Sequence, residues 1–277
     1  SEMCIRDRKY ILCGLLLGLA INIKIMPGLL FSYLIYRGYF RVFFICISTI
    51  VILLFLPAIF IGNDFNQTLL SSWWQTIDPS NPTNGTVSDL GIHSIEALIP
   101  AYLTETVGQL SYKRNIFNLS SGNIAIIINL SRILILSLSL FFLRSLPFKK
   151  QQTRLNFYWE TSFFIMIIPL LLPRQHKYAF LLVTPMLCYL FYFLILTFNG
   201  NKTRIYKWIL CMFSICLFFY SPLYGSSIIG WFLFLFTQHY KFLTFATLLI
   251  IPLAVYCNPE RLELLNLIKK HKSGYNN

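Results

Sequence analysis

Residues 42–61 read VFFICISTIVILLFLPAIFI, a run that contains no charged side chain. A helix needs about 20 mainly apolar residues to cross the hydrocarbon core of a bilayer. The run therefore predicts a transmembrane helix, which the turn formers Pro57 and Gly62 bring to an end.

The composition of the whole chain supports the same class. Of 277 residues, 56% are hydrophobic and only 12% are charged. A soluble domain carries about 25% charged residues, so this chain cannot cover its apolar surface with a polar coat. We therefore predict an all-α, polytopic membrane helix bundle.

The net charge of +13 does not indicate nucleic acid as a partner. The lysines and arginines lie in short clusters between the apolar runs, as the positive-inside rule predicts for cytoplasmic connections. They form no single basic patch, and membrane lipid is the partner that the pattern favours.

The apolar runs predict about seven spans. The first is interrupted by Lys24 and Pro27, and is either one tilted span or two half-helices. Gly14 and Gly18 give it a face small enough for close helix packing. Residues 228–236 are too short to cross and are interfacial or re-entrant. The predicted spans are 10–36, 42–61, 124–143, 155–172, 178–198, 205–220 and 242–257.

The distribution of basic residues predicts the orientation and the domain boundaries. The basic connections and the tail at 258–277 are expected to be cytoplasmic, so the C-terminus is cytoplasmic. The long polar segment 63–122 is expected to be an external loop, with the membrane parts 10–62 and 123–257 on either side. The opening octet SEMCIRDR resembles translated adapter sequence, so residues 1–9 are predicted to be a non-native leader of a C-terminal fragment.

Two groups of cations are candidates for binding a phosphate. Lys24 lies inside an apolar run, where an ammonium costs roughly 2.5–3.5 kcal/mol and usually faces a protein interior or a water-filled cavity. Arg174, His176 and Lys177 precede Tyr178 in the turn between two spans, and Arg and Lys both suit phosphate oxygens. The alternatives are a lysine that extends to the interface and a membrane-edge anchor.

The external segment 63–122 holds the remaining candidates. Asp89, His93 and Glu96 have the spacing of one helix face, and any of them is a weak candidate for acid–base catalysis. Trp73 and Trp74 are either a stacking surface for a sugar or interfacial anchors. The seven cysteines show no metal or redox spacing, and the sequence indicates no metal and no cofactor.

Three of these segments, in this order, resemble family 87 glycosyltransferases. Residues 14–27, GLLLGLAINIKIMP, resemble the glycine-rich span that ends in Lys-x-x-Pro. Residues 91–95, GIHSI, are similar to the Gly-x-Gln-Ser-Leu element of the external loop, with His93 in the Gln position. Residues 173–178, PRQHKY, followed by LLVTP at 181–185, resemble the Pro…His-x-Tyr…Leu-x-x-Pro segment. The resemblance covers residues 10–257.

The resemblance implies a GT-C membrane fold and an inverting transfer of a hexose, often mannose, from a polyprenyl-phosphate sugar donor at the outer face of the plasma membrane. It implies a catalytic aspartate in an external loop upstream of this fragment, so the fragment alone is expected to be inactive. Carried over residue by residue, it assigns five residues to the pocket: Lys24, His93, Ser94, His176 and Tyr178. A transporter or flippase of lipid-linked sugars is the alternative, because it would use the same cations without a base.

Overall fold

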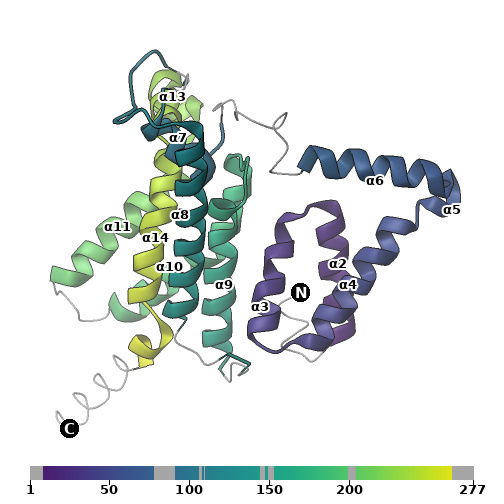
Figure 1. The fold of residues 1–277 in the computed structure, drawn as a ribbon. Helices are drawn as coiled ribbons and strands as arrows, with labels where there is room; N and C mark the ends of the chain where they lie inside the picture. The colour runs from purple at the N-terminus through teal and green to yellow at the C-terminus, as the bar shows by residue number, and fades with distance from the viewer. Residues whose placement is uncertain are drawn as a thin grey trace, which may run out of the picture. The chain divides into compact units, whose positions relative to one another are not determined.

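The computed structural model describes residues 9–77, 91–105, 108, 110–143, 147–148, 153–198 and 204–263. Within these ranges the chain is helical and contains no named strand, which confirms the all-α prediction (Figure 1). The chain divides into two compact units, residues 1–87 with 145–150 and residues 88–144 with 151–277. The boundary at 87 and 88 falls inside the segment predicted as the external loop.

The first unit begins with a broken helix. Lys24 has extended backbone angles (φ −152°, ψ 125°) directly after the first helix, so the alternative of two half-helices is the correct one. The 3-10 turn that follows carries Pro27, which fixes φ and cannot continue the helical hydrogen bonds. The helices of this unit are α2 (Tyr10–Ile23), η1 (Met26–Leu29), α3 (Leu30–Tyr36), α4 (Phe40–Phe55), α5 (Ala58–Ile61) and α6 (Asn63–Ile77).

Close packing between α2 and α4 depends on the two predicted glycines. A Cβ added to Gly18 would lie 2.6 Å from the Cβ of Thr49 and 3.0 Å from the carbonyl oxygen of Cys46. A Cβ added to Gly14 would lie 2.6 Å from Ile45 Cγ2. The backbones therefore approach more closely than any larger residue permits, as in small-residue packing between transmembrane helices.

The polar segment after the second span is not a structureless loop. Gly62 takes a left-handed φ of 84°, which a glycine adopts without steric cost, and the chain re-enters a helix at once. That helix, α6, carries both Trp73 and Trp74 with exposed indoles.

The second unit is built around α9, whose side chains from residue 159 to residue 170 are almost all buried. Phe163, Met166 and Leu170 have no exposed surface. Glu160 is also completely buried. The helices of this unit are α7 (Ile95–Leu103), α8 (Ser121–Phe142), α9 (Arg154–Leu171), η3 (Lys177–Val183), α10 (Thr184–Phe198), α11 (Arg204–Tyr220), η4 (Pro222–Tyr224), α12 (Ser226–Ile229), α13 (Trp231–His239) and α14 (Phe242–Tyr256).

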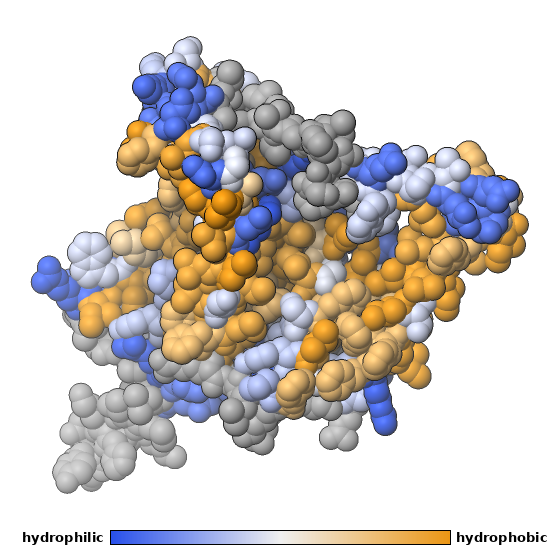
Figure 2. All heavy atoms as spheres, in the orientation of Figure 1, coloured by the Kyte–Doolittle hydropathy of each residue, from blue (hydrophilic) through white to orange (hydrophobic). Residues whose placement is uncertain are grey.

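Three helices in the described ranges are long and apolar enough to cross a membrane: Phe40–Ile61, Ser121–Phe142 and Lys177–Thr197. The helices α13 and α14 meet at 61°, and they add a fourth span if the bent pair crosses the membrane as one unit. The predicted count of seven is therefore not confirmed. Several of the predicted spans are not among these helices. The helix α9 is polar in its first half, and α11 has only 17 residues. Figure 2 shows hydrophobic residues along the sides of the second unit's helices and hydrophilic residues around the end near α13.

The glycine packing gives the first prediction. Gly18→Ala should lower the thermal unfolding temperature of the membrane-embedded protein, because overpacking a tight contact costs about 1–3 kcal/mol. Gly28→Ala is the matched control, since a Cβ there meets nothing within 4 Å. Equal unfolding temperatures for the two variants would show that the α2–α4 contact tolerates a methyl group.

Candidate functional site

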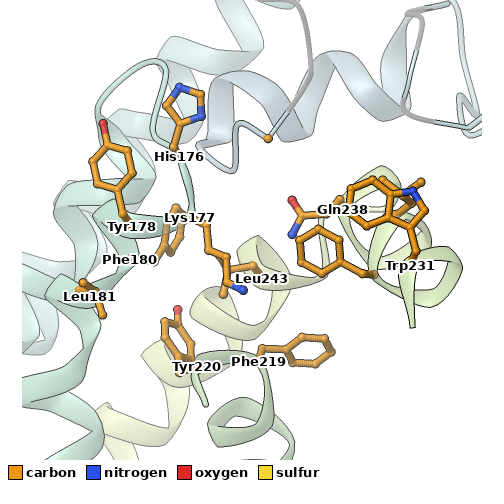
Figure 3. Close-up of a pocket in the computed structure, with 13 residues that line it drawn as sticks. His176, Lys177, Tyr178, Phe180, Leu181, Phe219, Tyr220, Trp231, Gln238 and Leu243 are labelled. Atoms are coloured by element: carbon orange, nitrogen blue, oxygen red, sulfur yellow. The ribbon is translucent and has the colours of Figure 1, made fainter. Parts of the chain in front are cut away.

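A pocket of about 850 Å³ lies in the second unit (Figure 3). The turn after α9, the end of α11, the helix α13 and the start of α14 supply its walls. Most of the lining side chains are aromatic or aliphatic, and a few polar groups are set among them, as is usual for ligand sites. The lining residues are Gly91, His176, Lys177, Tyr178, Phe180, Leu181, Phe219, Tyr220, Trp231, Phe234, Leu235, Gln238 and Leu243.

The backbone brings together two segments that the sequence marked separately. The amide of His93 donates to the carbonyl oxygen of Gln175 at 2.7 Å, and Ile92 forms an isolated antiparallel bridge with His176. Gly91 enters this pairing with a φ of 79°, and Arg174 leaves α9 with a φ of 52°. Both values are left-handed, and they allow the two turns to lie against each other. The predicted proximity of the GIHSI and PRQHKY segments is thus present within one unit.

Lys177 is the cation that enters the pocket. Its Nζ donates to the carbonyl oxygen of Tyr224 at 3.0 Å and lies 4.5 Å from the centroid of the Tyr224 ring and 5.4 Å from that of Phe234. In Figure 3 the side chain runs into the middle of the pocket, with Gln238 across from it. An ammonium has three N–H donors, so one bond to a carbonyl leaves two that can bind an anion.

The neighbours of Lys177 in the turn differ in their placement. His176 and Tyr178 line the pocket with their rings stacked 5.9 Å apart, and in Figure 3 both point away from the Lys177 ammonium. Arg174 is exposed and is not among the lining residues. Of the four residues predicted in this turn to bind a phosphate, His176, Lys177 and Tyr178 line the pocket, and Arg174 does not.

His93 is a neutral hydrogen-bonding group. Its side chain is completely buried, and its Nε2 is paired with Oε1 of Gln238. Burial, the positive charge of Lys241 and smaller contributions from Lys177 and His176 together lower the pKa of His93 to about 3, although the hydrogen bond with Gln238 acts in the opposite direction. A general base works best with a pKa near the operating pH, so this imidazole is poorly suited to that role.

The prediction that Asp89, His93 and Glu96 share a helix face is wrong for the part that the structure describes. Ser94 is the extended N-cap of α7, so His93 lies before the helix and Glu96 in its first turn. Glu96 pairs instead with Arg132 of α8, 3.6 Å away. Asp89 lies outside the described residues. The buried hydroxyl of Ser94 has no hydrogen-bond partner among them.

The other predicted pocket residues belong to the first unit. Lys24 is exposed at the end of α2, and Trp73 and Trp74 are exposed by 45% and 60% on α6. None of them is among the residues that line the described pocket, and their roles stay predictions. Within the described ranges no group of three His, Cys, Asp or Glu side chains is placed to hold a metal ion.

Several polar residues that build the site were not predicted from the sequence. Gln238 lines the pocket, and its Nε2 donates to the Tyr224 hydroxyl at 3.2 Å. Lys241 is only 1% exposed, and its Nζ donates to the carbonyl oxygen of Ile92 at 2.8 Å. Arg132, inside the apolar run 124–143, supplies the partner of Glu96. The only sequence signal for the first two was a short polar interruption, QHYK at 238–241, between apolar runs.

That interruption is the bend between α13 and α14, and the 91–116 segment holds it in place. Arg114 donates to the carbonyl oxygen of His239 at 2.8 Å, and the Tyr102 hydroxyl donates to that of Tyr240 at 3.0 Å. The His239 ring contacts the same segment through Nε2 and the carbonyl oxygen of Tyr112, 2.9 Å apart. The contacts from Arg114 and Tyr102 satisfy carbonyl groups that the end of α13 leaves without intrahelical partners.

The buried neutral His93 predicts a loss of stability in acid. The folded protein holds its pKa at about 3, whereas an unfolded histidine titrates near about 6.5. As the pH falls below about 6.5 the unfolded state therefore takes up a proton first, which reduces the free energy of unfolding by up to about 1.4 kcal/mol per pH unit. Thermal unfolding from about pH 7 to about pH 5 measures this range.

The matched variant is His93→Gln, which can still donate to Gln238 but cannot take up a proton. We expect its unfolding temperature to fall less steeply than that of the wild type over the same pH range. Parallel curves for the two proteins would show that His93 does not carry this acid sensitivity.

Comparison with known proteins agrees with the sequence motifs. Residues 3–107 match the family model described as glycosyltransferase family 87. Curated proteins and solved structures gave no match. The matched range includes the glycine-rich span and the GIHSI element, and family 87 implies glycosyltransferase activity. Over residues 3–107, the match confirms the resemblance to family 87 glycosyltransferases drawn from the sequence.

Proposed function

We propose that this protein is a membrane glycosyltransferase that takes a hexose, with mannose as the first candidate, from a polyprenyl-phosphate donor. The acceptor receives the sugar at the outer face of the plasma membrane. The family match supports glycosyl transfer. The observation that carries the choice of donor is the Lys177 ammonium inside an aromatic-walled pocket, next to His176.

The pocket suits a lipid phosphate for two separate reasons. Its walls include Phe219, Trp231 and Leu235, which offer apolar surface to an isoprenoid chain. Its cation is partly exposed and lies over the rings of Tyr224 and Phe234, where it can form a charge-assisted hydrogen bond to phosphate. A nucleotide-sugar donor would require hydrogen-bonding groups for a base and a ribose, and the lining supplies few polar side chains.

The proposed reaction is a single inverting displacement. A carboxylate removes the proton of the acceptor hydroxyl, and that oxygen forms a bond to the anomeric carbon of the sugar. The bond from the anomeric carbon to the phosphate oxygen breaks, and the electron pair leaves with the polyprenyl phosphate. Lys177 would stabilise the negative charge on the leaving phosphate, because fixed donors aimed at developing charge lower the barrier. His176, which lines the same pocket, is proposed as a further contact for the phosphate.

The remaining proposed roles follow from the sequence. Lys24 and Arg174 are proposed as further cations for the phosphate, and Tyr178 as a wall of its site. Ser94, Trp73 and Trp74 are proposed to contact the sugar. We do not assign the base to His93 or Glu96, because His93 is weakly basic and Glu96 faces Arg132.

The proposed topology has about seven spans in a GT-C-like bundle, with the cytoplasmic C-terminus that the basic connections favour. In this count, the bent pair α13 and α14 forms one broken span. The two half-helices on either side of Lys24 form another. The pocket would open toward the outer face, at the depth of lipid phosphates.

A transporter or flippase of lipid-linked sugars is the second candidate. The bend of 61° between α13 and α14 favours it, because discontinuous helices often form the substrate sites of transporters. Such a protein would bind the same donor in the same pocket and release it intact. Release of free polyprenyl phosphate together with a glycosylated acceptor separates the enzyme from the transporter.

Lys177→Met should reduce transfer of radiolabelled mannose from polyprenyl-phosphate mannose by about 10- to 100-fold in the membrane-embedded full-length protein, because a hydrogen bond to a charged group contributes about 1.5–3 kcal/mol. Lys177→Arg should retain part of the activity, since the charge remains but the geometry changes. Lys207→Met is the matched control, because Lys207 is exposed on α11 and does not line the pocket.

Full activity in Lys177→Met would refute phosphate binding by Lys177. Equal losses in Lys177→Met and Lys207→Met would attribute the effect to reduced positive charge instead of to the pocket.

A further inference from the structure

A buried chain of hydrogen bonds leads from the 91–94 segment to the residue that holds Lys177. His93 Nε2 is paired with Gln238 Oε1, and Gln238 Nε2 donates to the hydroxyl of Tyr224 at 3.2 Å. The carbonyl oxygen of Tyr224 in turn accepts from Lys177. Four residues of the second unit are therefore linked in series, and the last link runs through the backbone carbonyl of Tyr224.

Gln238 is the central member of this chain. Its side chain is only 4% exposed, and both ends of its amide are used. Because the amide nitrogen donates to Tyr224, the amide oxygen is the acceptor, and the His93 ring donates to it through Nε2. A neutral histidine with its proton on Nε2 fits this arrangement, and its buried Nδ1 has no hydrogen-bond partner among the described residues.

Tyr224 is held by more than its contact with Gln238. It has no exposed surface, its hydroxyl lies 2.6 Å from Thr237 Oγ1, and its ring packs edge-on against Phe219 with centroids 5.2 Å apart. A residue fixed at its hydroxyl and its ring has a fixed backbone carbonyl as well. That carbonyl and the ring face are the groups that hold the Lys177 ammonium.

We infer that Gln238 is a positioning residue, which fixes Tyr224 and through it the Lys177 ammonium at the place where the donor phosphate binds. This inference rests on the proposed function. Gln238 acts through Tyr224, so its loss should weaken recognition of the phosphate and leave the apolar part of the ligand site unchanged. Replacement by an apolar side chain would leave the His93 donor and the Tyr224 hydroxyl without this partner inside the protein.

The test compares two probes in the purified full-length protein: a short-chain isoprenyl monophosphate and the isoprenol of the same chain. The dissociation constant of each probe is measured for the wild type and for Gln238→Leu, Tyr224→Phe, Lys177→Met, His93→Leu and His93→Gln. The ratio of the two constants isolates phosphate recognition from binding of the apolar chain.

For Gln238→Leu we expect about a tenfold weaker affinity for the phosphate, the loss that one hydrogen bond accounts for. The affinity for isoprenol should stay within about twofold of the wild type, because the aromatic walls remain. Tyr224→Phe, which keeps the ring and the carbonyl, should shift the ratio in the same direction. His93→Leu should do so too, whereas His93→Gln should restore the wild-type ratio, since an amide donates to Gln238 in the same way.

Three results would overturn the inference. Equal loss of affinity for both probes in Gln238→Leu would show a structural effect on the whole pocket. If Gln238→Leu keeps the wild-type ratio of dissociation constants while Lys177→Met loses the preference for the phosphate, the proposed function stands and Gln238 has no such role. If the wild type binds the phosphate no more tightly than the isoprenol, phosphate recognition and the inference both fail. Should Gln238→Leu not fold, Tyr224→Phe and the His93 pair decide between these outcomes.

Discussion

The second unit depends on how it satisfies the backbone at the bend between α13 and α14. In an apolar environment every exposed carbonyl and amide must find an internal partner, because water does not supply one. Here the carbonyl oxygens of His239 and Tyr240 accept hydrogen bonds from Arg114 and Tyr102. In the opposite direction, the Lys241 ammonium donates to the carbonyl oxygen of Ile92. The 91–116 segment and the bent helix pair therefore stabilise each other, and neither conformation is explained by its own sequence.

The pocket follows from that mutual support. Because the bend is fixed, α13 presents Gln238 and Trp231 to the turn that carries Lys177. The same 91–93 backbone that caps the bend also pairs with Gln175 and His176. In the proposed reaction, the leaving phosphate needs a cation that does not reorganise as charge develops. An ammonium held by a carbonyl and two aromatic rings meets that need better than a lysine on a solvated loop.

Much of the helical framework could be predicted from hydrophobicity. The runs 155–172, 205–220 and 242–257 correspond within a residue or so to α9, α11 and α14. The close-packing role of Gly14 and Gly18 was also visible, since small residues at helical spacing have few other uses in an apolar span.

The remainder depends on contacts between residues far apart in the chain. A hydrophobic run does not reveal where a helix bends, so the structure does not confirm the predicted number of spans. The spacing of His93 and Glu96 suggested a helix that in fact begins at Ile95. A single Gln or Lys among apolar residues gives no sign of its partner, which for Gln238 lies 145 positions away.

Lys241 places two opposing demands on one position. Its left-handed backbone, with φ at 56°, favours glycine or asparagine and costs another L-residue about 1–2 kcal/mol. Its buried ammonium, however, reaches the carbonyl oxygen of Ile92, which neither of those shorter residues can do. Substitution at this site is therefore constrained in two ways. Glycine or asparagine would relieve the backbone strain but would lose the hydrogen bond to the 91–93 segment. A long donor side chain would keep that hydrogen bond but would retain the strained backbone. Among relatives that share this architecture, position 241 should vary less than the aromatic residues around it, and a change there should be accompanied by a compensating change near Ile92.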